Sequence, residues 1–181
     1  MLTTKIETER LMLKALVEDD ATELFEIFSD HEVMRYWNTA PWRSIDEAKT
    51  FISDSTASMS SNTDMILGIY LKDNGQLLGK VMLFNYAKES RRAEIGFGLS
   101  RNAWGKGIIF EAGNALIDHA FNTLQLRRIE AEIDPENTAS GNTLERLGFE
   151  KEGLLRQRWE VNGIVSDSAL YGLLAEGLNK V

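Results

Sequence analysis

The sequence has no cysteine, two prolines, two histidines and no long uncharged apolar run. The absence of cysteine excludes disulfides, thiolate metal sites and a cysteine nucleophile. His31 and His119 lie far apart and form no HExxH-type pair, so we expect no metal site. No apolar segment approaches the roughly 20 residues of a membrane-spanning helix, and residues 1–7 lack the apolar core of a signal peptide. We therefore expect a cytoplasmic protein without a membrane partner.

Positive charge is also scarce, because 20 Lys and Arg stand against 28 Asp and Glu, for a net charge of −8. Nucleic-acid phosphates need a basic face, so this balance argues against nucleic acid as a partner. An anionic ligand would have to be held by local donors, whereas the overall field favours a cationic substrate. With 43% hydrophobic and 27% charged residues, the chain has the composition of one globular domain, which we expect to span residues 1–181.

The spacing of apolar residues predicts strands and helices along the whole chain. The predicted strands cover residues 6–16, 65–71, 77–86, 92–99, 127–133, 149–159 and 164–174. Asn-Gly pairs at 74–75 and 162–163 predict hairpin turns, because they supply the positive φ angles that such turns need.

Helices are predicted after Asp19, from Ser44 towards Ser58, at 109–121 and at 137–147. Ser44 and Glu47 have the spacing of a capping box. The aromatic segment 33–42 is predicted to be a connection, and the serine-rich segment 53–62 to fray into a loop. The order predicts an α+β (mixed α/β) layered domain, with a mostly antiparallel, twisted sheet of about seven strands and about four helices.

The segment 102–107, Asn-Ala-Trp-Gly-Lys-Gly, joins the predicted strand 92–99 to the predicted helix 109–121. Two glycines at such a junction let backbone amides close around an anion, and the helix N-terminus adds partial positive charge, which suits a pyrophosphate. A Rossmann fingerprint needs glycine where Phe110 stands, and a Walker loop needs Ser or Thr where Gly107 stands. The alternatives are therefore a pyrophosphate site of another kind and a tight turn without a ligand.

Further motifs flank this junction. Gly96 and Gly98 lie inside the preceding strand, where glycine marks a bulge or the close approach of a ligand. Downstream stand Asp-Pro-Glu-Asn-Thr-Ala-Ser at 134–140 and Glu-Arg-Leu-Gly-Phe at 145–149. In this order, the pieces resemble the Gcn5-related N-acetyltransferases, and more closely the RimJ/RimL branch, which acetylates protein N-terminal amines. Further positions of this sequence also resemble that branch, namely 7–13, Glu111-Ala112, 152–153, 162–163, Asp167 and Tyr171.

The resemblance implies that acetyl-CoA lies between two splayed strands, 92–99 and 127–133. Backbone amides along 102–108 would hold the pyrophosphate, and an amide along 97–99 would stabilise the oxyanion of the thioester carbonyl. Asn137 would contact the pantetheine arm and also cap a helix. The cofactor-binding residues implied in this way are Phe97, Leu99, Asn102, Ala103, Trp104, Gly105, Lys106, Gly107, Ile108 and Asn137.

The implied reaction requires a neutral amine, and therefore a base. Glu94 is the first candidate, because strand alternation places it on one face with the two strand glycines. The alternative is an exposed carboxylate that pairs with Arg92 or Arg127. Glu160 is a weaker candidate base, and His119 is expected to be a structural residue.

Ser140 is the candidate that protonates the leaving thiolate. Many enzymes of this type have a tyrosine seven residues after the asparagine, where this chain has Leu144. The alternative for Ser140 is a hydrogen bond to the backbone in the first helical turn. With no cysteine and no nucleophile elbow, we expect direct transfer in a ternary complex. Asn102 and Ile109 depart from the family pattern and are expected to weaken a phosphate contact and to narrow the groove.

The expected acceptor is a primary amine. The resemblance suggests the N-terminus of a ribosomal protein, and a polyamine or aminoglycoside is the alternative. A non-catalytic acyl-CoA-binding protein on the same fold is the alternative outside enzymes. The aromatics Tyr36, Trp37, Trp42 and Phe51 are expected in core and lid packing, where some would line the acceptor site. Either a monomer or a homodimer is compatible with the sequence.

Overall fold

The computed structural model describes residues 1–175, whose strands form one eight-stranded sheet with the order β1-β2-β3-β4-β5-β6-β8-β7. Within this range only the pair β5–β6 is parallel. The mixed α+β fold with a mostly antiparallel sheet is therefore confirmed. The strands are β1 Lys5–Glu7, β2 Leu11–Ala15, β3 Met65–Leu71, β4 Leu77–Ala87, β5 Arg92–Leu99, β6 Arg128–Ile133, β7 Glu150–Val161 and β8 Ile164–Leu174.

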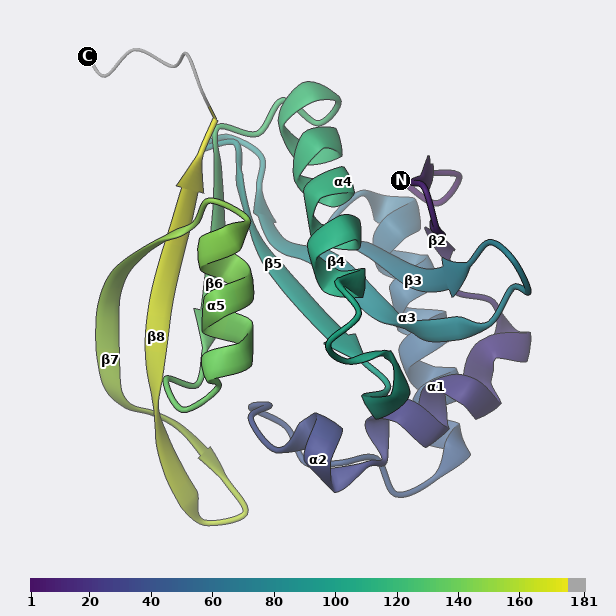
Figure 1. Cartoon of the computed structure of the whole chain (residues 1–181), viewed down its shortest axis with the longest axis horizontal. Coiled ribbons are helices and arrows are strands. Elements are labelled where there is room, and N and C mark those ends of the chain that lie inside the picture. Colours follow the sequence, from purple (N-terminus) through teal and green to yellow (C-terminus); the bar gives the residue numbers. More distant parts are fainter. Residues whose placement is uncertain (176–181) are drawn as a thin grey trace.

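Within residues 1–175, five α-helices and two short 3-10 helices cover the sheet. The α-helices are α1 Ala21–Phe28, α2 His31–Met34, α3 Ile45–Ser61, α4 Ile108–Asn122 and α5 Thr138–Arg146, and the 3-10 helices are η1 Glu18–Asp20 and η2 Arg101–Ala103. α4 and α5 lie in front of the sheet in Figure 1, and α1 to α3 lie behind it. The sheet is therefore the middle layer of three.

The N-terminal region contains one strand and one helix more than the sequence predicts. The predicted strand 6–16 is wrong in its middle, because the chain turns at 8–10 and pairs β1 with β2. The Leu11 N–H donates to Thr8 Oγ1 over 2.9 Å and closes this turn. The predicted connection 33–42 overlaps α2, which Asp30 caps by accepting a hydrogen bond from the Glu32 N–H. Short-range side-chain hydrogen bonds account for both differences.

The capping box of α3 is confirmed, because the side chains of Ser44 and Glu47 each accept a hydrogen bond from the other's backbone N–H. The predicted fraying over 53–62 is wrong, since α3 continues to Ser61. The hydroxyls of its serines and threonines donate to backbone carbonyls within the helix, as Ser55 does to Phe51 over 2.6 Å. Helix and hydroxyl hydrogen bonding therefore coexist here rather than compete.

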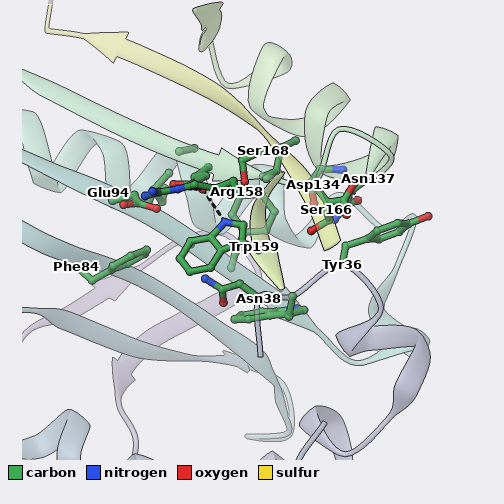
Figure 2. Close-up of a pocket in the computed structure, with 18 of the residues that line it drawn as sticks. Tyr36, Asn38, Phe84, Glu94, Asp134, Asn137, Arg158, Trp159, Ser166 and Ser168 are labelled. Atoms are coloured by element: carbon green, nitrogen blue, oxygen red, sulfur yellow. Dashed lines mark hydrogen bonds and ion pairs between the residues drawn. The ribbon is translucent and has the colours of Figure 1, made fainter. Parts of the chain in front are cut away.

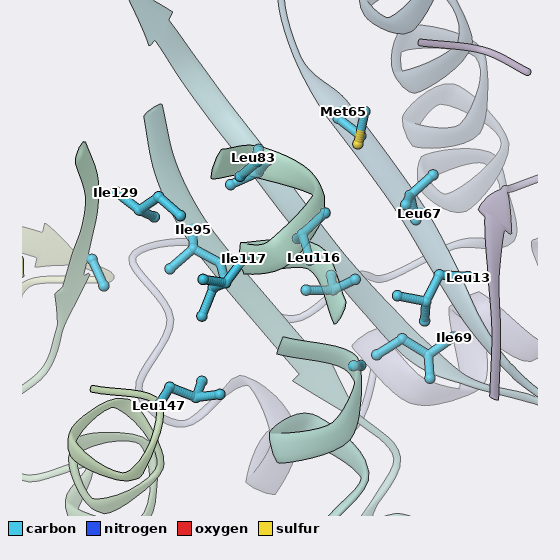
Figure 3. Packing of buried hydrophobic residues seen from close by; sticks show 14 of the residues in the cluster. Leu13, Met65, Leu67, Ile69, Leu83, Ile95, Leu116, Ile117, Ile129 and Leu147 are labelled. Atoms are coloured by element: carbon cyan, nitrogen blue, oxygen red, sulfur yellow. The ribbon is translucent and has the colours of Figure 1, made fainter. Parts of the chain in front are cut away.

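Two hydrophobic clusters hold the three layers together. The larger one packs α4 against the central strands, with Leu13, Ile69, Ile95 and Leu116 among its buried members (Figure 3). The smaller one joins α1, α2 and α3 to the opposite face of the sheet. Each central strand therefore contributes side chains to both faces, which fixes its register against a slip of one residue.

β5 and β6 diverge after a short paired stretch. They pair from Arg92–Arg128 to Glu94–Glu130, and β5 then runs on to Leu99 without β6 beside it (Figure 1). The predicted splayed pair is therefore confirmed. The sheet opens between these strands, with α5 and the hairpin β7–β8 on the far side of the opening.

The glycines of β5 have a spatial cause. Of the two alternatives for Gly96 and Gly98, the predicted bulge is wrong, because β5 pairs regularly with β4 from 94 to 99. The bulge in this strand pair lies instead near Asn85, whose φ is 52°. A Cβ on Gly98 would stand 2.8 Å from Trp37 Cζ2 and 2.9 Å from Phe28 Cε1. The strand therefore needs glycine so that these aromatic rings can lie directly on its backbone.

Candidate active site

A pocket of about 360 Å³ lies where β5 and β6 separate. Glu94, Phe97, Asn137 and Ser140 all line it, so the structure brings together four residues that the sequence analysis selected. Figure 2 shows that side chains from several elements surround this pocket, with Glu94 towards one end and Asn137 towards the other. Strand, loop and helix residues thus meet at one cavity.

Glu94 is half-buried in this pocket. Its Oε2 accepts a hydrogen bond of 3.1 Å from Asn85 Nδ2. Burial raises the pKa of Glu94, and the negative charges of Glu132 and Glu130 add to that rise. A carboxylate whose pKa lies closer to neutrality is a stronger base than an ordinary one.

The ion pairs predicted as the alternative role for Glu94 do not form among the described residues. Arg92 Nη1 lies 2.8 Å from Glu130 Oε2, and Arg127 Nε donates to the Ser90 carbonyl over 2.7 Å. Glu160, the weaker candidate base, is exposed near the β7–β8 turn and does not line the pocket. Glu94 is therefore the better placed of the two candidates.

A second polar group in the pocket was missed from the sequence. Glu132 Oε1 accepts hydrogen bonds from Trp159 Nε1 over 2.7 Å and from Arg158 Nε over 3.2 Å (Figure 2). These partners lie next to a bulge in β7, where Gln157 has a φ of 52° and its N–H donates to Asp167 Oδ1 over 2.8 Å. The available signal was the charge that alternates with apolar residues along β6.

α5 begins at the edge of the pocket. Asn137 Oδ1 accepts a hydrogen bond of 3.1 Å from the Ser140 N–H, which confirms the predicted cap. The Ser140 hydroxyl makes no hydrogen bond with the residues described. It is therefore available to a ligand in the pocket, and the backbone hydrogen bond predicted as its alternative role does not form within 1–175.

The remaining predicted residues lie beyond the C-terminal end of β5, away from this pocket. The side chains of Leu99, Ala103 and Ile108 are buried in the core, and Asn102 is exposed. Trp104 Nε1 donates to the Leu99 carbonyl over 3.1 Å, which ties the loop to the strand.

The backbone amides of this loop divide into two groups. The amides of Ala103 and Trp104 donate to carbonyls within η2. Those of residues 105–108 have no acceptor within the described part of the chain. Gly105 and Gly107 have φ values of 70° and 73°, so glycine is needed to aim these amides. Four adjacent N–H groups at the start of α4 form a ready anion site.

Arg10 braces the same loop from the N-terminal hairpin. Its Nη1 donates to the Lys106 carbonyl over 3.0 Å, and its Nε lies 2.6 Å from Glu111 Oε2. Burial disfavours the charged form of Glu111, but hydrogen bonds from Thr8 and Arg10 outweigh it and lower the pKa. The Glu111 carboxylate is thus held by the N-terminal hairpin, and Ile109 packs against the core cluster.

The sheet opens between two parallel strands, with a half-buried carboxylate at the opening and a glycine-rich amide loop after β5. This arrangement is typical of enzymes that transfer acyl groups. The family model for the GNAT acetyltransferase domain matches residues 10–150, and the chain therefore belongs to this family of N-acetyltransferases. The uncharacterized N-acetyltransferase p20 of Bacillus licheniformis is 38% identical over 170 residues, which cover 92% of this chain and 94% of p20.

Two further similarities concern ribosomal-protein acetylation. The ribosomal protein uS5-alanine N-acetyltransferase of Escherichia coli is 28% identical over 178 residues, covering 93% of this chain and 90% of that enzyme. The structure of Mycobacterium smegmatis RimJ in complex with CoA-disulfide has a TM-score of 0.88 at 26% identity, covering 98% of this chain and 90% of RimJ. The resemblance to the RimJ/RimL branch is therefore confirmed. None of the helices in residues 1–175 is long and apolar enough to span a membrane.

Proposed function

We propose that this protein transfers the acetyl group of acetyl-CoA to a primary amine by direct attack in a ternary complex. The observation that carries this proposal is the pocket at the opening between β5 and β6, into which Glu94 and Ser140 both reach. Similarity to the uS5-alanine enzyme supports the N-terminal amine of a protein, and of a ribosomal protein in particular, as the acceptor.

The residues present fit acetyl-CoA at both ends of β5. The amides of 105–108 would hold the pyrophosphate, while the strand edges that part after Glu94 and Glu130 leave room for the pantetheine arm. Asn137 and the backbone at Phe97 border the same pocket. Bound there, acetyl-CoA supplies the acetyl group as an activated thioester.

Two side chains of this protein then move protons. Glu94 removes a proton from the acceptor amine, and its raised pKa makes it a more effective base near neutral pH. Ser140 donates its hydroxyl proton towards the leaving sulfur, from the first turn of α5. Glu132, held by Arg158 and Trp159, adds negative charge that stabilises an ammonium before its proton is lost.

A polyamine is the second candidate acceptor. Glu94, Glu132, Asp134 and Asp167 all line the pocket, and four carboxylates favour a cationic molecule. Both candidates are tested by release of free thiol from acetyl-CoA in the presence of N-terminal peptides, polyamines or aminoglycosides. Acceptor-dependent release supports the proposed transfer and identifies the acceptor class. Acetyl-CoA binding in a calorimeter without release for any amine would instead support an acyl-CoA-binding protein.

A further inference from the structure

Lys80 is a buried cation without a counter-charge. Its side chain is 4% exposed and lies on β4 opposite Gly98, on the sheet face that α1 to α3 cover. None of the ion pairs or side-chain hydrogen bonds within residues 1–175 involves its Nζ. Sequence reasoning missed it, although a lysine inside the apolar run 77–83 was a visible signal.

Four aromatic rings surround this ammonium. Their centroids lie 3.7 to 5.6 Å from Lys80 Nζ, and the rings belong to Phe28, Trp37, Trp42 and Phe51. Contact with an aromatic face stabilises a cation only modestly. The loss of hydration on burial costs more than that, and it lowers the pKa of Lys80 to about 7. The rings therefore only partly replace the missing counter-charge.

Lys80 also borders open space. It lines a second pocket, of about 570 Å³, to which Trp42 and Phe51 also contribute. Within residues 1–175 no fully buried side-chain nitrogen lacks a hydrogen-bond partner, so Nζ is not sealed off from this space. Trp37, Asn38 and Met82 line both this pocket and the Glu94 pocket, which makes the two cavities neighbours. An acceptor bound at Glu94 can therefore extend towards Lys80.

The other charged groups at the second pocket favour an anion. Arg43 adds a second positive charge to its lining. Glu47 also lines it, but its Oε2 accepts hydrogen bonds from the N–H groups of Arg43 and Ser44 at the start of α3. That carboxylate is committed to capping a helix and is not available to Lys80.

We propose that the acceptor is an amine that also carries a carboxylate, which pairs with Lys80 while the amine lies beside Glu94. This inference rests on the proposed function and specifies its substrate. Lys80 and Phe84 share one face of β4, and Phe84 is the register partner of Glu94. Four residues of strand span roughly 13 Å, so the amine and the carboxylate must lie well apart in the acceptor.

Two sources can supply this carboxylate. One is the carboxylate of a free ω-amino acid, and the other is an acidic side chain at the second or third residue of a peptide. A polyamine fits less well, because its second ammonium would lie close to Lys80 and Arg43. The aromatic walls of the pocket suit an apolar stem between the amine and the carboxylate.

The test compares acceptors that differ only in charge. Peptides with Asp or Glu at the second or third position are compared with the same peptides carrying Asn or Gln there, and free ω-amino acids with their amides, by thiol release at saturating acetyl-CoA. We expect the wild-type protein to prefer the carboxylates by about 10-fold or more in kcat/KM, since a desolvated charge pair contributes at least that much. The Lys80→Met variant should lose the preference, because its kcat/KM on the carboxylates falls much more than its kcat/KM on the neutral amides.

Lys14→Met is the matched control. Lys14 Nζ lies 4.5 Å from the ring centroid of Tyr70, so this variant also removes a cation from an aromatic face, but outside both pockets. It should retain the wild-type preference. The inference is overturned if the wild-type protein uses carboxylates and amides equally, or if Lys80→Met slows both sets alike.

A second measurement keeps the test independent of catalysis and of how the variant folds. N-acetylated ω-amino acids should raise the melting temperature of the wild-type protein more than their amides do, because a ligand that binds only the folded state stabilises it. Equal shifts would contradict the role of Lys80. Absence of thiol release with every acceptor would contradict the proposed function instead, and the ligand-induced shifts would then still decide whether this pocket binds a carboxylate.

Discussion

The two neighbouring pockets each contain a buried ionisable group, but the groups that surround it differ. Around Glu94 several polar groups are close by, with an amide donor from Asn85 and the Glu132–Arg158 pair. Around Lys80 the nearest groups are four aromatic rings. Both pockets nevertheless share Trp37, Asn38 and Met82, so these residues lie between a polar compartment around Glu94 and an aromatic compartment around Lys80.

Burial pushes both groups towards their neutral forms. It raises the pKa of the Glu94 carboxyl and lowers the pKa of the Lys80 ammonium to about 7. The raised pKa makes the Glu94 carboxylate a stronger base, because it then binds a proton more tightly. For Lys80, burial leaves an electrostatic cost in the free protein, which an incoming anion would relieve. Under the proposed function, the first pocket therefore suits proton transfer and the second suits recognition of an anion.

The largest expected effect concerns the polar compartment. Glu94→Gln should lower kcat by about 100-fold to 10,000-fold, the range that a positioned base contributes. In the wild-type protein, kcat/KM should rise with pH through the pKa of Glu94, which lies above the usual range for glutamate, and the variant should lack this rise.

Glu160→Gln provides the control for this prediction, because Glu160 is exposed and lies outside the pocket. It should leave both the rate and the pH profile close to those of the wild-type protein. If Glu94→Gln transfers acetyl groups to every amine as fast as the wild-type protein does, Glu94 is not the base.

The next largest effect concerns the aromatic compartment, and it is a change in the free energy of unfolding with pH. The unfolded chain binds a proton at Lys80 up to a pH near 10.5, whereas the folded protein loses it near pH 7. The unfolded state therefore binds more protons between these values, and the stability of the wild-type protein gains from rising pH there. Lys80→Met lacks this contribution.

The free energy of unfolding of Lys80→Met should therefore exceed that of the wild-type protein most below pH 7. This difference in stability should shrink as the pH rises towards 10.5. Each pKa unit corresponds to about 1.4 kcal/mol, so the change across this window approaches about 5 kcal/mol. Urea unfolding of both proteins at a series of pH values measures it, with Lys14→Met as the baseline for losing a lysine. A constant difference across the window would show that the ammonium is not desolvated.

A smaller effect is expected at the boundary between the compartments. Trp37→Ala removes a wall common to both pockets, and we expect the KM of the acceptor to rise about 10-fold, or about 1.4 kcal/mol. The KM of acetyl-CoA should change less, because the residues 105–108, whose amides would hold the pyrophosphate, line neither pocket. Initial rates with each substrate varied in turn separate the two constants. An unchanged acceptor KM would place the acceptor elsewhere.

Local signals in the sequence account for much of the fold. The Ser44–Glu47 capping box, the Asn137 cap and the Asn-Gly turns were all predictable, because each depends on residues within a few positions of one another. The amide loop at Gly105 and Gly107 was predictable for the same reason, since glycine is the residue that adopts positive φ freely. The structure brings Glu94, Asn137 and Ser140, which were selected from the sequence and its family resemblance, together at one pocket.

What could not be predicted depends on contacts between distant segments. Arg10 reaches the Lys106 carbonyl across 96 positions of sequence, and no local pattern announces this hydrogen bond. The bulge at Gln157 has a positive φ without glycine, so the inward position of Arg158 and Trp159 was not visible either. The cage around Lys80 is assembled from three helices or loops and one strand, and only the packed structure joins them.

The smallest expected effect concerns Ser140. Its hydroxyl makes no hydrogen bond with other residues in 1–175, so Ser140→Ala removes one interaction with the leaving sulfur and leaves the protein's own contacts intact. A single hydrogen bond contributes about 0.5–1.5 kcal/mol, and we expect kcat to fall about 2-fold to 12-fold. The rise of kcat/KM through the pKa of Glu94 should persist, because the base is unaltered. Ser166→Ala removes a residue's hydroxyl from the β8 side of the same pocket and should leave kcat nearly unchanged. If the two variants lose equal activity, the effect belongs to the polarity of the pocket in general, and the position of Ser140 at the start of α5 has no special part in the transfer.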